Sequence, residues 1–304
     1  MTVTSGNVRP NLYLIDASIY IFRAYFSMPS SMMERDGEVN HAVYGFTQFL
    51  LDFLEFLNKE PDGSLVSVAY DESLNTCYRN AIFPDYKTNR DEPDDNMMYQ
   101  VARCQEVTGL LGLHFLSLYD YEADDIIGTI AHQMGESYRS VILTRDKDLG
   151  QLLSRDDVLW DFAAGTTMDG DAVTEKFGVR PDQIADYLAL AGDTVDNIPG
   201  VNGVGGKTAA ALLTNFNSID ELFERVSEVS GTGIRGASKL QEKLENAKED
   251  VRLYQSITAI NLEAPLTVDH DLLVPGRVDV GSVMAFCERM NFGKRIRDRV
   301  QQLG

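Results

Sequence analysis

Acidic side chains are concentrated in two neighbouring stretches, YEADDIIGTI from residue 121 and VILTRDKDLG from residue 141. Carboxylates held close together repel one another, and some stay protonated unless a cation neutralises them. Clustered carboxylate oxygens suit a hard divalent ion such as Mg²⁺ or Mn²⁺. A single Asp after a strand is as often a helix cap or a turn former, so this interpretation requires that the acids meet in space. The candidates in these stretches are Glu122, Asp124, Asp125, Asp146 and Asp148.

The segments that would position these acids are short, apolar and rich in β-branched or aromatic residues. LYLIDAS from residue 12, LVSVAYDES from residue 65 and SVILTRDKD from residue 140 each run into an aspartate, at Asp16, Asp71 and Asp146. A fourth run, LHFLSLY from residue 113, leads into Glu122. Near-continuous apolar strands are typical of a parallel sheet covered on both faces. Helical patterns at 41–57 and 124–134 lie between the strands and indicate an α/β fold with a mostly parallel sheet.

The expected topology places these acids together. Sites in such sheets form at the carboxyl ends of the strands, where Asp16, Asp71 and Asp146 all fall. Asp124 and Asp125 open the helix after the fourth strand, so their turn lies at the same edge, and the helix dipole favours negative charge there. We therefore expect the carboxylates to converge.

A second motif, GDTVDNIPGVNGVGGKTAAALL, begins at residue 192. Its Asp193 and Asp196 are three residues apart and would share one face of a helical turn. Glycines at 200, 203, 205 and 206 then lead into a helix that begins near Lys207 or Thr208, and such a hairpin exposes backbone N–H groups to a phosphate. A Walker A loop is one rival, but Val201 stands where its first glycine is required. The other alternative is a tight turn between two helices.

Cations and aromatic rings alternate in YRNAIFPDYKTNR, from residue 78. Arg79, Lys87 and Arg90 are interleaved with Tyr78 and Tyr86, a combination that suits phosphates and unstacked bases. The alternative is a solvated helix face. The basic stretch NFGKRIRDRV, from residue 291, is interpreted as a solvated terminal helix, with contact to a nucleic-acid backbone as its alternative.

Composition limits the possible functions. The chain has 304 residues, 44% of them hydrophobic, and a formal net charge of −20. Setting aside the nine candidate acidic ligands leaves 38 acids against 27 bases, so any polyanion must meet a locally basic track. No apolar run is long enough to span a membrane, the three cysteines are too scattered for a disulfide framework, and no secretory signal is visible, so we expect a cytoplasmic protein. After about residue 170 the pattern changes to short helices joined by Gly/Pro turns.

The motifs together resemble those of a known family. LIDAS, AYDES with DYKTNR, EADDIIGT, TRDKDLGQLL and ALAGDTVDNIPGVNGVGGKTAAALL occur in the order seen in bacterial and phage 5′-nucleases, the flap-endonuclease-like family. This family includes the 5′→3′ exonuclease domain at the front of DNA polymerase I. The resemblance covers about residues 11–270, and the ordered set is far more specific than any single motif. No polymerase domain follows, so we expect a free-standing member.

The resemblance implies a fold and an activity. The fold would be a PIN-like α/β domain at residues 8–170 with an arch at about 78–105, followed by a helical domain at 171–304. That second domain would carry a helix–three-turn–helix region, a helix–hairpin–helix DNA-binding motif, at about 184–215. The activity would be hydrolysis of DNA that has a free 5′ end or a 5′ flap. We expect a monomer that depends on two Mg²⁺ or Mn²⁺ ions and does not associate with membranes.

The resemblance also implies metal ligands and catalytic residues. One ion would be held by carboxylates of the first strands and the following helix, namely Asp16, Asp71, Glu122 and Asp124, with Asp125 in or next to its shell. A second ion would be held by carboxylates that come later in the chain, namely Asp146, Asp148, Asp193 and Asp196. The catalytic residues would be Asp71, Lys87, Arg90 and Asp148.

Further residues would contact DNA in this family. Lys87 and Arg90, at the base of the arch, would contact the scissile phosphate, Arg79 would bind nearby, and Tyr86 would orient the unpaired nucleotide. The hairpin would bind the duplex backbone through Gly200, Gly203, Val204, Gly205, Lys207 and Thr208, and would hold a potassium ion at Val201 and Val204. One divalent ion would lower the pKa of a bound water and the other would stabilise the leaving 3′ oxygen, while Lys87 would oppose the charge on the phosphate.

The sequence departs from the family pattern in two places, and other functions stay open. Arg145 stands where many relatives carry glycine, and we expect it to reduce the charge of the second metal site. The presumed arch continues as RDEPDDNMMYQ, which is acidic, so we expect weaker DNA binding there. The alternative functions are a non-catalytic binder of flapped or branched DNA and a phosphohydrolase of small molecules. RNA as the substrate is a variant of the nuclease hypothesis.

Overall fold

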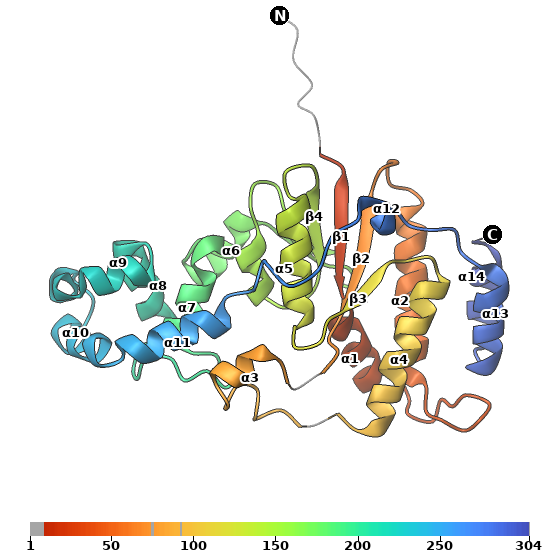
Figure 1. Ribbon diagram of the computed structural model, residues 1–304, viewed down its shortest axis with the longest axis horizontal. Coiled ribbons are helices and arrows are strands. Elements are labelled where there is room, and N and C mark those ends of the chain that lie inside the picture. Colours follow the sequence, from red (N-terminus) through yellow and green to blue (C-terminus); the bar gives the residue numbers. More distant parts are fainter. Residues whose placement is uncertain (1–8, 74–75, 92, 304) are drawn as a thin grey trace, which may run out of the picture.

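The computed structural model describes residues 9–73, 76–91 and 93–303, and a six-stranded sheet lies at its centre (Figure 1). The strand order is β3-β2-β1-β4-β5-β6. The first five strands are parallel, and β6 is antiparallel to β5. The predicted mostly parallel sheet is therefore confirmed. The strands are β1 (Asn11–Asp16), β2 (Leu65–Tyr70), β3 (Phe115–Ser117), β4 (Arg139–Leu143), β5 (Val158–Asp161) and β6 (Thr166–Met168).

The register of the inner strands brings their carboxyl ends to one edge of the sheet, which we call the carboxyl edge. Asp16 of β1 pairs with Ala69 of β2, and the preceding residue of β1 pairs with Leu143 of β4. Asp71 directly follows β2, and Asp146 follows β4 after a short loop. Three aspartates that are distant in the sequence therefore leave the sheet at the same edge.

The side chains of β1 alternate between two hydrophobic cores, one on each face of the sheet. Leu12 and Leu14 belong to the core that includes α5, whereas Tyr13 and Ile15 belong to the core that includes α1, α2 and α4. Because both faces are covered, the strand is apolar at every position rather than at alternate ones. The covering helices are α1 (Ala17–Ser27), α2 (His41–Leu57), α4 (Asp95–Leu110) and α5 (Ala123–Met134).

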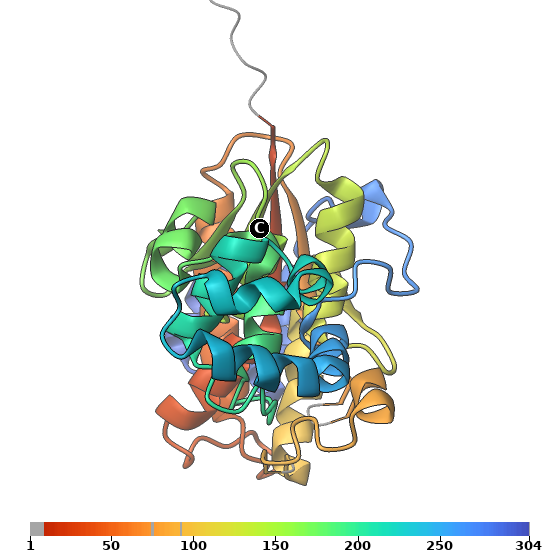
Figure 2. The same cartoon turned by 90° about the vertical axis from the view of Figure 1, so that its left-hand side faces the viewer.

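A group of shorter helices extends from one side of the sheet, on the left in Figure 1 and toward the viewer in Figure 2. The expected change to short helices after about residue 170 is seen here, and residues 237–258 form two helices, α10 and α11. None of the helices in the described ranges is long and apolar enough to cross a membrane. The remaining helices before residue 260 are α3 (Tyr78–Ile82), α6 (Gly170–Phe177), α7 (Ile184–Ala191), α8 (Gly206–Phe216), α9 (Ile219–Glu224), α10 (Ala237–Asn246) and α11 (Lys248–Thr258), with 3₁₀ helices at Asp148–Leu152, Pro181–Gln183 and Val226–Gly231.

The end of the chain returns to the α/β part of the molecule. Side chains of α13 and α14 share the core that includes α2 and α4. Arg299 donates hydrogen bonds to Asp52 at 2.7 Å and to Glu55 at 2.8 Å, both on α2. This packing departs from the expectation that residues 171–304 form one helical unit. The helices concerned are α12 (His270–Leu273), α13 (Val280–Arg289) and α14 (Lys294–Gln301).

The connection between α7 and α8 is closed by backbone contacts. Asp193 and Ile198 exchange N–H···O hydrogen bonds of 2.9 and 2.7 Å. Gly200 has a φ of +64°, and a Cβ added there would lie 2.3 Å from the backbone nitrogen of Gly192. Both the backbone conformation and the available space therefore require glycine at this position.

We expect Gly200→Ala to lower the free energy of unfolding by at least about 2 kcal/mol, because it adds a left-handed alanine and a backbone clash. Gly205→Ala is the matched control, since Gly205 has a φ of −100° and open space around its Cα. The control should change the free energy of unfolding by less than about 1 kcal/mol. Urea unfolding curves measure both, and equal effects of the two substitutions would contradict this account of the turn.

Candidate active site

Carboxylates from separate segments meet at the carboxyl edge. Asp16 is only 4% exposed, and burial together with the charges of Asp71 and Asp146 raises its pKa to about 7. Thr144 donates a hydrogen bond of 3.0 Å to Asp16, and the Ser18 hydroxyl donates to Asp71. The structure therefore brings the acids that follow β1, β2 and β4 into one site. Sequence reasoning missed Ser18 and Thr144, because a hydroxyl next to a strand end carries no distinctive pattern.

Asp148 and Asp124 extend this cluster. Asp148 begins the 3₁₀ helix after β4, and burial together with the charges of Asp146 and Asp193 raises its pKa to about 8. Burial also raises the pKa of Asp124 well above its usual range, with further contributions from Asp146 and Asp16. Each of these shifts reflects a negative charge held in a poorly solvated place near other negative charges.

The donor set fits a hard divalent cation. Its members are carboxylate oxygens, and Asp148 Oδ1 is buried without a hydrogen-bond partner in the described part of the chain. Within the described ranges, no three acidic, histidine or cysteine side chains already enclose a point where a metal ion would lie. The fold thus gathers possible ligands around a narrow cavity of about 20 Å³ without preforming a coordination shell. The carboxylates that line this cavity are Glu122, Asp124, Asp148, Asp193 and Asp196.

Two cations of the predicted basic segment reach the same site. Lys87 forms an ion pair with Glu122, and its backbone N–H donates to the carbonyl of Asp196 at 3.1 Å. Arg90 pairs with the Asp196 carboxylate at 2.6 Å. Burial acts to raise the pKa of Glu122, but the charges of Lys87 and Arg79 outweigh it and lower that pKa. Lys87 also has a φ of +56°, which is uncommon for a residue with a side chain and is typical of constrained positions in sites.

Two of the predicted residues lie differently from the expectation, and a third, Asp125, is buried beside them. The Tyr86 ring is only 2% exposed, and its hydroxyl lies 3.0 Å from Glu122 and 3.1 Å from Asp196, so in this structure it cannot stack on a nucleotide. Arg79 is also 2% exposed and cannot reach DNA. Asp125 is fully buried and accepts hydrogen bonds from Arg79, whose guanidinium also donates to Glu122. Asp125 is not among the carboxylates that line the acidic cavity. Arg79 therefore has a structural place rather than the expected DNA-contacting one. Asp125, expected in or next to the shell of the first ion, lies next to Glu122 with both of its oxygens bound to Arg79.

Arg145, which we expected to reduce the charge of the second site, is exposed and turned toward the end of β5. Its Nε lies 3.2 Å from an Asp161 carboxylate oxygen at the end of β5. The β5–β6 hairpin that carries Asp161 was not predicted, because its strands contain only four and three residues. The charge of Arg145 is thus partly balanced outside the carboxylate cluster.

The predicted glycine hairpin leads into α8. Gly203, Gly205 and Lys207 are exposed, whereas the side chains of Val201 and Val204 are buried. The amides of Thr208 and Ala209 in the first turn of α8 donate to the Gly205 carbonyl at 2.9 and 3.0 Å. Within the described ranges, the amides of Gly206 and Lys207 have no acceptor and are available to an anion.

A cation from a distant helix lies over this hairpin. Lys243 of α10 donates a hydrogen bond of 2.8 Å from Nζ to the carbonyl of Asn202. The same ammonium lies 2.7 Å from where a Cβ of Gly203 would be. No local sequence signal connects Lys243 to the hairpin, so sequence reasoning missed it.

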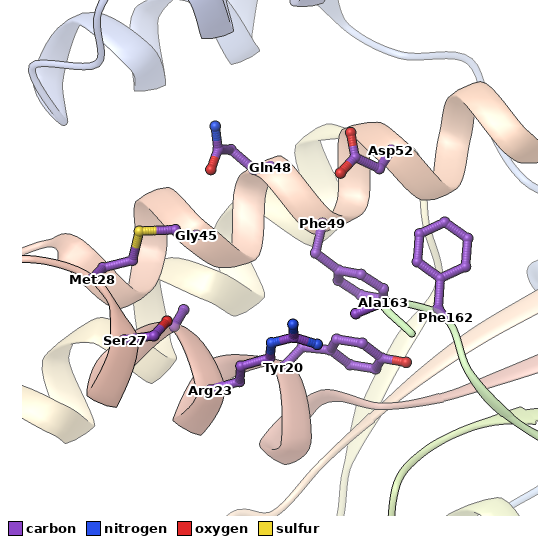
Figure 3. A pocket seen from close by; sticks show the side chains of 11 residues that line it. Tyr20, Arg23, Ser27, Met28, Gly45, Gln48, Phe49, Asp52, Phe162 and Ala163 are labelled. Carbon is purple, nitrogen blue, oxygen red and sulfur yellow. The ribbon is translucent and has the colours of Figure 1, made fainter. Parts of the chain in front are cut away.

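A separate cavity of about 320 Å³ lies between α1, α2 and the β5–β6 turn (Figure 3). Its wall includes the stacked rings of Tyr20 and Phe49, whose centroids are 3.7 Å apart. Its one carboxylate, Asp52, pairs with Arg299. None of the predicted site residues lines this cavity, so the chemistry is assigned to the narrower acidic one.

Known families match this arrangement along nearly the whole chain. A model described as 5′-3′ exonuclease, N-terminal resolvase-like domain, matches residues 11–178, and one described as 5′-3′ exonuclease, C-terminal SAM fold, matches residues 179–280. The chain belongs to the 5′-3′ exonuclease family. This 5′-3′ exonuclease family member is 36% identical over 293 residues to DNA polymerase I of Pseudomonas aeruginosa, in an alignment that covers 96% of this chain and 31% of that protein. The chain therefore spans about a third of the length of this relative. The predicted family is confirmed.

Solved structures share the fold of this exonuclease family member. A structure of T5 5′-exonuclease with bound divalent zinc ions has a TM-score of 0.65 at 16% identity and covers 96% of this chain and 98% of its own. The catalytic core of Rad2 in complex with DNA substrate has a TM-score of 0.63 at 17% identity and covers 100% of this chain and 96% of its own. At these identities the likeness shows the fold, and the predicted combination of a mostly parallel sheet with a helical second part is confirmed.

In the metal-free protein we expect Asp148→Asn to raise the melting temperature by at least about 4 °C at pH 8. The pKa of Asp148 is raised to about 8 in the folded protein, so the wild type loses stability as the pH rises from the usual aspartate range toward 8. Asparagine carries no charge and avoids this loss, and its advantage should shrink at pH 5 and disappear near pH 4. Thermal melts in EDTA at these three pH values measure the effect. An advantage that does not change with pH would contradict the crowding of charges at this site.

Proposed function

We propose that this chain hydrolyses phosphodiester bonds of DNA at a free 5′ end or a 5′ flap, using two divalent cations. One observation carries the proposal, namely that carboxylates from separate segments converge beside Lys87 and Arg90. A cluster of buried acids that two cations only partly neutralise is costly for stability, and such clusters are typical of reactive sites. The membership of the 5′-3′ exonuclease family supports the same reaction class.

The carboxylates divide into two groups by position. Asp16, Asp71, Glu122 and Asp124 lie at the ends of β1 and β2 and the start of α5, and they would hold one ion. The second ion would be held by the acids of the loop after β4 and of the α7–α8 connection, namely Asp146, Asp148, Asp193 and Asp196. Bound divalent ions supply a water of lowered pKa and neutralise the charge of the leaving oxygen. The zinc ions named for T5 5′-exonuclease support divalent metal here, and Mg²⁺ or Mn²⁺ suits an oxygen-only donor set.

Lys87 and Arg90 would orient the scissile phosphate. Lys87 is held over the cluster by its contacts with Glu122 and with the Asp196 carbonyl. A positive charge fixed at this place opposes the negative charge that grows on the phosphate during the reaction. Arg90 is more exposed than Lys87 and lies at the mouth of the site, where the flanking phosphate would enter.

The exposed hairpin before α8 would hold the duplex part of the substrate. Amides at the start of α8 and the ammonium groups of Lys207 and Lys243 would bind phosphates without reading bases. We further propose a potassium ion at the hairpin carbonyls of Val201 and Val204, and a monomer that acts in the cytoplasm. The DNA substrate named for the Rad2 catalytic core supports DNA as the ligand.

The proposal is tested with a 5′-flap DNA substrate and Mg²⁺. The wild type should cleave it, and EDTA or Asp148→Ala should reduce kcat by at least about 10²-fold, because the charge that neutralises the leaving oxygen is lost. Binding of the same DNA by Asp148→Ala should persist. Binding without any cleavage by the wild type would favour a non-catalytic DNA binder instead, and cleavage in EDTA would exclude the two-ion mechanism.

A second prediction concerns the basic track. Lys207→Ala should weaken binding of flap DNA of any sequence and reduce the slope of log K against log salt by about 1. Lys59→Ala is the control, because Lys59 is exposed and lies far from the proposed site. Its neighbour Glu60 contacts Asn11, the first residue of β1, whereas the carboxylates lie at the other end of that strand. Fluorescence anisotropy at several salt concentrations measures both variants. Equal salt slopes for wild type and Lys207→Ala would show that DNA does not contact this hairpin.

A further inference from the structure

The guanidinium of Arg79 is completely paired inside the protein. Its Nε donates to the Ile257 carbonyl at 2.9 Å, and one terminal nitrogen donates to the Ala259 carbonyl at 3.1 Å and to Asp125 at 2.7 Å. The other terminal nitrogen donates to Asp125 at 2.8 Å and to Glu122 at 3.1 Å. An arginine has five N–H donors, so all of them are used and none is left for a phosphate.

These contacts join three segments that are far apart in the sequence. Arg79 itself belongs to α3, directly before the segment that carries Lys87 and Arg90. Asp125 belongs to the first turn of α5, and it also accepts the backbone N–H of Asn261 at 2.9 Å. The two carbonyls come from the end of α11 and the residue after it. A single side chain therefore holds the basic segment, the start of α5 and the chain after α11 in one arrangement.

Arg79 also contacts Glu122, which is among the ligands proposed for the first ion. The Oε2 of Glu122 faces Arg79 and the Tyr86 hydroxyl, while its Oε1 faces Lys87. The bonds on Oε2 restrict rotation of the carboxylate and keep Oε1 beside the Lys87 ammonium, at the edge of the acidic cavity that Glu122 lines. Arg79 also forms an ion pair with Asp125, which accepts the two shortest hydrogen bonds of the guanidinium, at 2.7 and 2.8 Å.

We propose that Arg79, fixed by Asp125, is a positioning residue that orients Glu122 for metal binding. The inference rests on the proposed function and gives Arg79 a place in it that involves no contact with DNA. Loss of the fixed geometry should weaken metal binding and slow the chemical step, because partners that orient a metal ligand commonly change metal affinity by about 10- to 100-fold. Binding of DNA should stay nearly unchanged.

Arg79→Lys tests this, because it keeps the charge and removes the planar five-donor geometry. We expect the Mg²⁺ concentration for half-maximal cleavage to rise about 10-fold or more and kcat to fall, with the KM for flap DNA within about 2-fold of the wild type. Asp125→Asn should act in the same direction, and the double variant should lose less than the sum of the two single losses. Arg225→Lys is the matched control, because Arg225 is exposed and pairs with Glu221 and Glu228 just after α9, outside the proposed site, and should leave all three quantities unchanged.

Other outcomes decide against the inference. A raised KM with unchanged kcat and metal requirement would make Arg79 a DNA contact. A lowered melting temperature with unchanged kinetics, or unfolding of both Arg79→Lys and Asp125→Asn, would make it scaffold only. Calorimetric binding of Mn²⁺ to the wild type and to Arg79→Lys gives a second readout that does not depend on cleavage. If the wild type fails to cleave but Arg79→Lys still weakens Mn²⁺ binding, the proposed function fails while the positioning role stands.

Discussion

Repulsion between carboxylates is the constraint on which the rest of this structure depends. Asp16 at the end of β1, Asp71 directly after β2 and the acids of the loop after β4 are brought to one edge by the parallel strands, and burial raises the pKa values of Asp16 and Asp71 there. Gathering such charges is unfavourable without opposite charge. The chain supplies part of that charge from one short segment, whose Lys87 and Arg90 pair with Glu122 and Asp196. Apart from Asp125, which pairs with Arg79, the other acids of the cluster form no ion pair within the described ranges, as expected of a site that binds cations.

The same reasoning reconciles an acidic chain with the polyanionic substrate that we propose. A net charge of −20 opposes DNA binding only if the charge is spread evenly. Here a part of the excess is confined to the carboxylate cluster, where divalent cations would offset it. The hairpin before α8 instead presents amides, the exposed Lys207 and the ammonium of Lys243. Substrate phosphates would therefore meet locally positive groups, whereas the acidic surface elsewhere would limit affinity and make it sensitive to salt.

The sequence predicted those features whose position in space follows from a local pattern of residues. Apolar strands that run into aspartate predicted β1, β2 and β4 and the edge where the acids meet, because parallel strands end on the same side. Sequence reasoning failed where the partner of a residue is distant. Arg79 within a basic and aromatic stretch has the pattern of a DNA contact, but its partner Asp125 lies 46 residues later and buries it. Lys243 and the return of α14 to α2 depend on tertiary packing in the same way, and the short β5–β6 strands carry too few residues for a periodic signal.

The neighbouring acids Asp124 and Asp125 illustrate why residue type alone does not assign a role. Successive residues of an α-helix point about 100° apart, so two aspartates in the first turn of α5 cannot face the same partner. Asp124 is influenced by the charges of Asp146 and Asp16, whereas Asp125 is fully buried and holds Arg79. The Asp124 carboxylate therefore belongs to the cluster at the carboxyl edge, whereas the Asp125 carboxylate fixes Arg79, the cation that orients Glu122. Asp125 thus stabilises the geometry of the site that Asp124 faces. The two acids act together although only Asp124 faces the site.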